Sequence, residues 1–121
     1  MNAVADAIAA IDAGEVPDKE TLKAAVRVLL KALADKAPGH TVEVRVPPYG
    51  AVQCVAGPRH RRGTPPNVIE CQPLVFVALA AGRTSFAEAA AAGKLAASGQ
   101  RADLTEHLPL TTPEGELLVD E

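Results

Sequence analysis

Hydrophobic residues recur with a helical period over the first third of the chain. Residues 3–13 are rich in alanine and other good helix formers and end at Gly14, a common helix stop. A second helix is expected over 19–36, with Asp18 suited to its N-cap. Its buried stripe follows the spacing i, i+4, i+7, i+11. The stripe consists of Leu22, Val26, Leu29 and Leu33.

From residue 40 onward the hydrophobic period changes to two, which is typical of strands. Valines alternate with polar residues over 42–46 and predict a half-buried strand. Further strands are expected over 51–55 and 68–71, separated by a loop over 57–66 that contains three prolines and two glycines. Three consecutive strands of this kind favour an antiparallel meander.

After residue 72 the pattern becomes helical again. Pro73 suits a first helical turn, and Ser85 and Glu88 have the spacing of a capping box. The expected elements are a helix over 74–81, a helix over 86–92, a strand over 94–98 and a helix near 102–108. The order is therefore α-α-β-β-β-α-α-β-α, an α+β fold in which the last strand joins the sheet after a helical excursion.

The pattern divides the chain into one domain with two flanking segments. Residues 1–18 form an N-terminal helical segment, residues 19–110 the α+β domain, and residues 111–121 an acidic C-terminal tail that we expect to be frayed. A chain of 121 residues is the length of one ordinary domain.

Composition narrows the function classes. The chain has two Phe, one Tyr and no Trp, so stacking platforms for nucleic acid are nearly absent and no nucleic-acid partner is expected. No apolar run approaches the roughly 20 residues needed to cross a bilayer, so we expect no stable membrane insertion. The N-terminus does not have the pattern of a signal peptide, and a cytoplasmic location is expected.

Positive charge is concentrated in one part of the chain. The net charge is −3, yet residues 19–62 hold nine Lys or Arg against three Asp or Glu. Two interpretations remain open: a surface that docks an acidic protein partner, or an ordinary solvated helix face. The helical part of this charge is a stripe at i+4 spacing, Lys19, Lys23, Arg27 and Lys31.

A second basic cluster lies in the loop that follows the second strand. Arg59, His60, Arg61 and Arg62 are consecutive and have prolines on both sides. A proline-stiffened loop loses little entropy on ordering, and arginine offers a planar fork to carboxylate or phosphate. We identify Arg59, His60 and Arg62 as candidate anion-binding residues. The alternative is an exposed loop kept soluble by its charges, with Glu70 pairing to one of the arginines.

The chain lacks the residue patterns of common catalytic and metal sites. It has no G-x-S-x-G elbow, no ligand-type histidine spacing and no Gly-rich phosphate loop between a strand and a helix. Cys54 and Cys71 are 16 residues apart in apolar segments, which indicates buried structural thiols. We therefore predict no catalytic residue, no metal and no cofactor, and a protein that is not an enzyme.

Large and small apolar residues alternate through residues 71–110. Such a mixture can leave an apolar pocket beside a sheet, and it can equally form a closed core in which helices approach through alanine. If a pocket exists, its lining is drawn from large residues of this region and one strand residue. The candidates are Val52, Leu74, Phe76, Leu79, Phe86, Leu95, Leu104 and Leu108.

Two stretches of the chain resemble a known family. The run Ala80-Ala81-Gly82-Arg83, then 86–92, Gly93-Lys94-Leu95 and Ser98-Gly99 is similar to the sterol carrier protein (type two) superfamily. The runs PPYGAVQC and GPRHRRGTPPNVIE resemble its small bacterial, mainly actinobacterial, branch. The resemblance implies a mostly antiparallel sheet of about five strands, helices over one face, and an apolar cavity that carries a lipid or acyl chain unchanged.

Together the residues and the resemblance predict a non-catalytic binding or carrier module. Its ligand would be an apolar small molecule or lipid, which an anionic head group would suit. The alternatives are an accessory or protein-interaction domain with a closed core, and a remnant of the C-terminal domain of a thiol-dependent isomerase.

Overall fold

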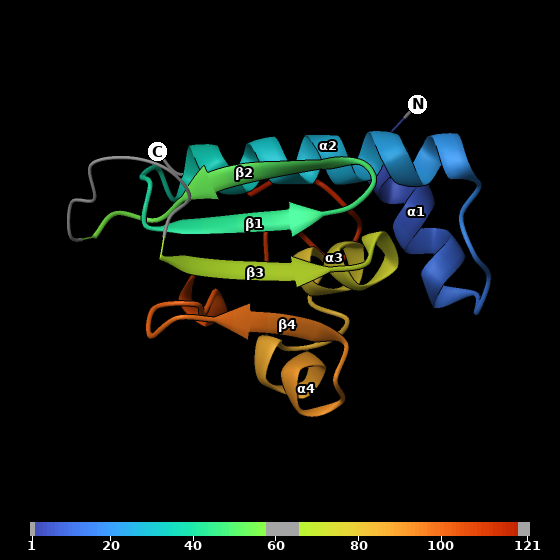
Figure 1. Ribbon diagram of the computed structural model, residues 1–121. Helices are drawn as coiled ribbons and strands as arrows, with labels where there is room; N and C mark the ends of the chain where they lie inside the picture. The colour runs from blue at the N-terminus through green and yellow to red at the C-terminus, as the bar shows by residue number, and fades with distance from the viewer. Residues whose placement is uncertain (1, 58–65, 119–121) are drawn as a thin grey trace.

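Two helices precede a four-stranded sheet in the computed structural model, which describes residues 2–57 and 66–118 (Figure 1). The helices are α1 (Ala3–Asp12), α2 (Lys19–Lys36), α3 (Pro73–Ala80) and α4 (Phe86–Ala91), with a short 3₁₀ helix η1 (Thr105–His107). The strands are β1 (Val42–Val46), β2 (Gly50–Cys54), β3 (Asn67–Cys71) and β4 (Leu95–Ser98). The α+β class is confirmed, and the element order agrees with the expectation apart from its last helix.

The starts of α1 and α2 are fixed by local side-chain caps. The Asn2 side chain accepts hydrogen bonds from the first turn of α1, and Asp18 accepts one from the Thr21 amide at 2.9 Å to begin α2. The helix expected over 102–108 is reduced to η1. There the Asp103 carboxylate accepts from the Thr105 amide at 2.8 Å, a local turn that competes with helix formation, and Pro109 follows.

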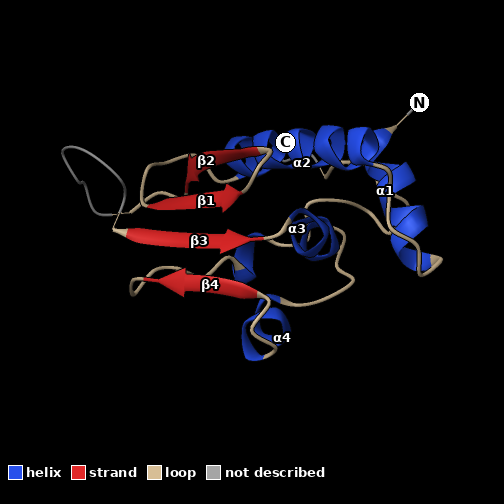
Figure 2. Cartoon of the chain, turned by 45° about the vertical axis from the view of Figure 1, so that its right-hand side comes forward, coloured by secondary structure: helices blue, strands red, loops and turns tan. Residues whose placement is uncertain are grey.

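The sheet has four strands in the order β2-β1-β3-β4, one fewer than the five or so that the resemblance implied (Figure 2). The expected antiparallel meander of three consecutive strands is wrong, although two of the three strand pairings are antiparallel. β1 is antiparallel to β2 but parallel to β3, and β4 is antiparallel to β3. The register explains the difference. Cys54, which ends β2, and Asn67, which begins β3, lie on opposite sides of Val42. The chain therefore leaves β2 and enters β3 at the same end of β1, which makes β3 parallel to β1.

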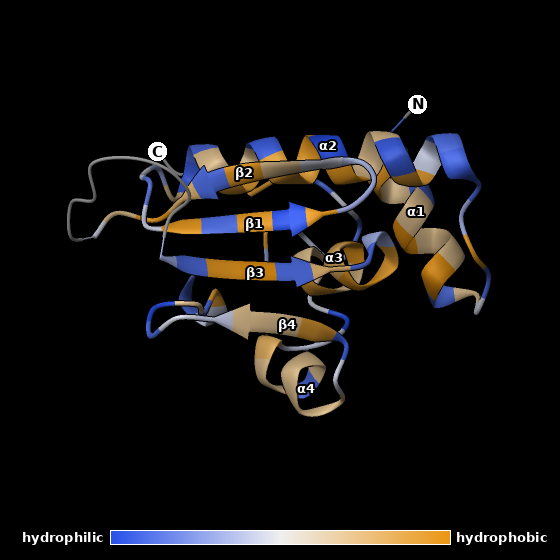
Figure 3. Ribbon diagram, viewed as in Figure 1, coloured by the Kyte–Doolittle hydropathy of each residue, from blue (hydrophilic) through white to orange (hydrophobic). Residues whose placement is uncertain are grey.

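One face of the sheet is buried and the other is polar. Val42, Val44 and Val46 are fully buried, whereas Glu43 and Arg45 between them are only half-buried. Figure 3 shows this alternation along β1. The helices pack on the valine side, where α2 contacts β2 and α3, and α1 contacts α2 and α3. Helical cover of one face, as the resemblance implied, follows from this period-two pattern.

The segment after Pro109 packs against the helices where a frayed tail was expected. Residues 110–118, here called the C-terminal hairpin, contain a bridge between Thr111 and Leu117. The Leu110 and Thr111 amides both donate to the Ala80 carbonyl at the end of α3, at 2.7 and 3.2 Å. Leu110 is 1% exposed, so its burial accounts for the attachment of this otherwise acidic segment.

A buried amide joins three parts of the sheet. The Asn67 side chain donates from Nδ2 to the Thr41 carbonyl and accepts from the Arg101 amide at Oδ1, both at 2.9 Å. These contacts connect the residue before β1 and the turn after β4 to the start of β3. Because Asn67 is 4% exposed, water does not readily replace either hydrogen bond.

We expect Asn67→Ala to lower the free energy of unfolding by about 1–3 kcal/mol, because both partners of the amide lose a hydrogen bond. Urea unfolding followed by circular dichroism measures this as a lower midpoint with an unchanged slope. Ser98→Ala, at an exposed position of β4, is the matched control and should change stability by at most about 0.5 kcal/mol. Equal midpoints for the two variants would contradict the role of Asn67.

Candidate functional site

A hollow of about 270 Å³ lies between α3, α4 and η1. Four apolar side chains line it: Leu79 of α3, Phe86 of α4, and Leu108 and Pro109 after η1. Polar residues share its wall, namely Arg83, Thr84, Ser85, Glu88 and Thr105. The hollow therefore combines an apolar lining with a polar border, an arrangement that suits an apolar ligand with a polar end.

The turn between α3 and α4 sets the shape of the hollow. Gly82 ends α3 with φ +73°, a left-handed conformation in which a side chain would be strained. Ser85 then opens α4 through a capping box: its hydroxyl accepts from the Glu88 amide while the Glu88 carboxylate accepts from the Ser85 amide, both at 3.0 Å. Both helix ends are thus locally fixed, and Phe86 is held next to the turn.

The structure brings together only part of the predicted apolar lining. Phe76 and Leu104, each 1% exposed, belong to the packed core and not to the wall of the hollow. Val52 and Leu95 are partly buried on β2 and β4, the opposite edges of the sheet. Leu74 is also partly buried. Of the eight candidates, the hollow thus unites Leu79, Phe86 and Leu108.

The predicted anion-binding residues Arg59, His60 and Arg62 lie outside the described residues. The described chain stops at Gly57 and resumes at Pro66, beside β2 and β3 respectively. The basic cluster stays a prediction from the sequence.

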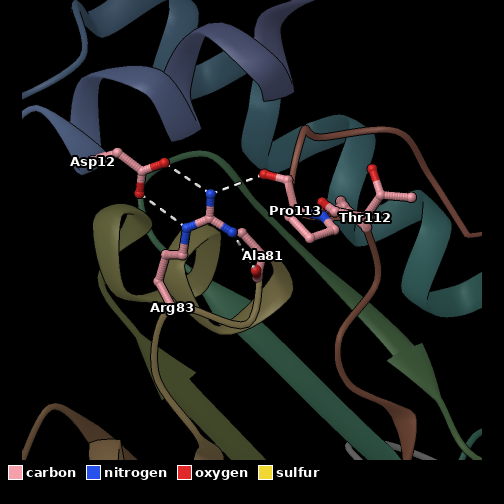
Figure 4. A network of polar contacts seen from close by, with 6 residues as sticks. Asp12, Ala81, Arg83, Thr112 and Pro113 are labelled. Atoms are coloured by element: carbon pink, nitrogen blue, oxygen red, sulfur yellow. Dashed lines mark hydrogen bonds and ion pairs between the residues drawn. The ribbon is translucent and has the colours of Figure 1, made fainter.

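An arginine beside the hollow joins three distant segments (Figure 4). Arg83 Nε and Nη2 donate to the two carboxylate oxygens of Asp12 at 2.9 and 2.8 Å. The same guanidinium donates from Nη1 to the Ala81 carbonyl at 3.0 Å and from Nη2 to the Pro113 carbonyl at 2.8 Å. It therefore connects the end of α1, the end of α3 and the C-terminal hairpin.

Asp12 and Arg83 each stabilise the charged form of the other. Hydrogen bonding from Arg83 holds the pKa of the Asp12 carboxyl below its usual value, and the bond to Asp12 raises the pKa of Arg83. A two-pronged arginine–carboxylate pair fixes orientation as well as charge. No periodicity or motif in the sequence predicts a role for Asp12, and the one sequence signal for Arg83 is the Gly82-Arg83 pair in the family resemblance.

The basic stripe of α2 lies on the solvent side of that helix, as expected. Lys19, Arg27 and Lys31 are exposed and Lys23 is half-buried. Within the stripe, Lys31 forms an ion pair with Asp35 at 2.7 Å, and Arg27 Nε donates to the Tyr49 carbonyl at 3.3 Å. Part of the stripe thus already interacts within the chain.

Both cysteines are buried free thiols, in agreement with the structural interpretation. Burial raises the pKa of Cys54 to about 11 and that of Cys71 to about 12. Within residues 2–57 and 66–118, no three His, Cys, Asp or Glu side chains are grouped as metal ligands would be. The described helices also include none that is long and apolar enough to span a membrane.

Comparison with known proteins gives one family match. A family described as "Bacterial SCP ortholog", SCP standing for sterol carrier protein, matches residues 18–110. No curated protein matches the chain significantly. The matched range includes the whole sheet, α2, α3, α4, the turn that carries Arg83, and every residue that lines the hollow.

We expect both cysteines to resist alkylation in the folded protein. The thiolate is the reactive form, and at pH 8 a pKa near 11 leaves about a hundredfold less of it than an ordinary cysteine has. Intact-mass measurement during iodoacetamide treatment should show almost no labelling until denaturant is added. Denatured protein that labels fully at both sites is the control, and rapid labelling of native protein would contradict the assignment.

Proposed function

The chain belongs to the bacterial sterol carrier protein ortholog family, and from this we propose that it is a non-catalytic carrier of an apolar, lipid or acyl-type ligand. The observation that supports the proposal most is the hollow lined by Leu79, Phe86 and Leu108. The hollow lies between short helices beside a sheet that has helices on one face only. This position suits a ligand that is bound and released without being chemically altered.

The energetics favour a long apolar ligand. Each buried methylene contributes about 0.8 kcal/mol, so ten methylenes contribute about 8 kcal/mol before the costs of ordering are subtracted. That is enough for binding without a polar contact. Ligand pockets commonly measure about 300–1,000 Å³, and the hollow, at about 270 Å³, lies just below this range. An outward movement of its wall would give a long ligand more room.

We place the apolar end of the ligand against Leu79, Phe86 and Leu108, with Phe76 and Leu104 behind them. Val52, Leu74 and Leu95 would join only if the cavity extended along the sheet. The polar border around Arg83 and Thr105 would then face the polar end of the ligand.

A second candidate function is an accessory domain that binds an acidic protein partner. Two observations favour it: Phe76, Leu79 and Leu104 are each 1% exposed, as in a closed core, and the basic stripe of α2 faces solvent. Here the surface would do the work and the hollow would stay empty. The two functions differ in whether an apolar ligand binds at all.

We expect Leu108→Trp to weaken binding of a fluorescent fatty acid at least tenfold, because the indole would fill the hollow that Leu108 now borders. Titration by fluorescence, with native mass spectrometry of gently purified protein, measures occupancy. Val28→Trp is the control, since Val28 is 42% exposed on α2 and does not line the hollow. Wild type that carries no lipid-mass adduct and binds no fatty acid would reject the carrier function in favour of the accessory domain.

For the basic loop, we expect Arg59→Ala or Arg62→Ala to weaken an anionic ligand about tenfold or more. A charge-assisted hydrogen bond contributes about 1.5–3 kcal/mol, and 1.4 kcal/mol corresponds to tenfold. An alcohol of the same chain length should bind all variants equally. If His60 shares the site, affinity for the acid falls as pH rises through about 6.5. Identical affinities for acid and alcohol in every variant would return the loop to a solubilising role.

A further inference from the structure

We propose that Arg83 is a positioning residue that latches the C-terminal hairpin, which directly follows one wall of the hollow, and that release of this latch is the step by which ligand enters and leaves. The inference rests on the proposed carrier function for its second half only. The attachment of residues 110–118 through Arg83 can be tested without any ligand.

The hairpin is continuous with one wall of the hollow. Leu108 and Pro109 line the hollow, and Leu110, the next residue, begins the hairpin. Only Pro109 separates Leu108 from Leu110, so a displacement of the start of the hairpin would move the wall of the hollow with it. Such a movement would enlarge the hollow of about 270 Å³ for a long ligand.

Among the described residues, a small number of contacts hold the C-terminal hairpin in place. Besides the amide bonds to Ala80, Lys36 Nζ donates to the Pro109 carbonyl at 3.1 Å and Arg83 donates to the Pro113 carbonyl. Leu117 and Leu118 are 41% and 42% exposed, so the second half of the hairpin is less buried than Leu110 at its start, which is 1% exposed. Segments with few buried contacts and solvent-exposed hydrogen bonds open locally at a lower free energy than the core does.

Arg83 is the contact that connects local opening of the hairpin to the proposed ligand site. Its residue borders the hollow, while its guanidinium holds Pro113 of the hairpin and Asp12 of α1 at the same time. The bidentate bond to Asp12 fixes the plane of the guanidinium, and the remaining donor on Nη2 is thereby aimed at the Pro113 carbonyl (Figure 4). Removing the side chain therefore removes one contact of the hairpin without changing the apolar lining.

The position of the latch predicts a local and not a global effect. Arg83 and Asp12 have partly exposed side chains, 25% and 49%, and ion pairs at the surface contribute little to overall stability. Loss of the latch should therefore leave the sheet intact. The same change should raise the rate at which residues 108–118 open.

Hydrogen exchange with mass spectrometry tests the latch in the full chain. We expect Arg83→Ala to speed exchange of peptides covering 108–118 about three- to tenfold, while peptides of β1 and β3 keep their wild-type rates. Arg83→Lys keeps the charge but loses the two-pronged geometry and should restore only part of the protection. Arg27→Ala is the matched control, because Arg27 also donates to a backbone carbonyl, that of Tyr49, on another side of the molecule. Unchanged exchange at 108–118 would overturn the latch, and so would equal acceleration throughout the sheet.

Stopped-flow mixing with a fluorescent fatty acid then tests its role in ligand entry. In Arg83→Ala we expect the association and dissociation rates to rise together, with a smaller change in Kd, because the variant alters access more than the lining. Faster exchange at 108–118 with unchanged ligand rates would overturn the gating role while leaving the attachment established. Wild type that binds no fatty acid would overturn the carrier function, and with it the gating half of the inference, whereas the exchange result would still decide the attachment.

Discussion

The pairing of β1 on both of its edges is the constraint on which the rest of the structure depends. β2 pairs with it antiparallel and β3 parallel, and Val42 is the common partner of Cys54 and Asn67. Because the side-chain period of a strand is two, this register puts Val44, Val52 and Ile69 on the same side of the sheet. A shift of one residue would turn the whole apolar set to solvent. The helices therefore cover one face of the sheet. The hollow lies among the last elements of this helical layer, α3, α4 and η1.

The cover is uneven, which explains where the hollow lies. α2 supplies six buried residues and packs beside β2, whereas α4 is a six-residue helix with two buried residues that contacts β4. β4 itself contributes only the partly buried Leu95, since its next three residues are exposed. Packing is therefore dense beside β1 and β2 and thinner beside β4. The hollow borders this thinner part, where fewer contacts are lost when a wall moves.

Patterns among neighbouring residues predicted most of the helices and strands. Contacts between residues far apart in the sequence could not be predicted in this way. The stripe of α2, the Asp18 cap and the capping box of α4 depend on residues at most a few positions apart, and each is present in the structure. Strand order depends on which edge of β1 receives β3, which no local pattern encodes. The same division holds for the candidate site. Leu79 and Phe86 lie on either side of one capped turn, so a local pattern could group them as candidates. Asp12 and Arg83 meet across 71 residues without any periodic signal.

A carrier has to stay folded when empty and still give way when loaded, and these demands conflict if one core serves both. In this fold they fall on different parts. The fully buried residues of α2 and β1, such as Leu29, Leu33 and Val44, hold the sheet to its main helix without involving the hollow. The hairpin that follows the wall at Leu108 is attached by buried Leu110 and, beyond it, by polar contacts near the surface. Exchanging such contacts for those of a ligand costs little, because water can satisfy the freed groups. The segment held by these polar contacts is therefore the part of the fold that can open while the core stays closed.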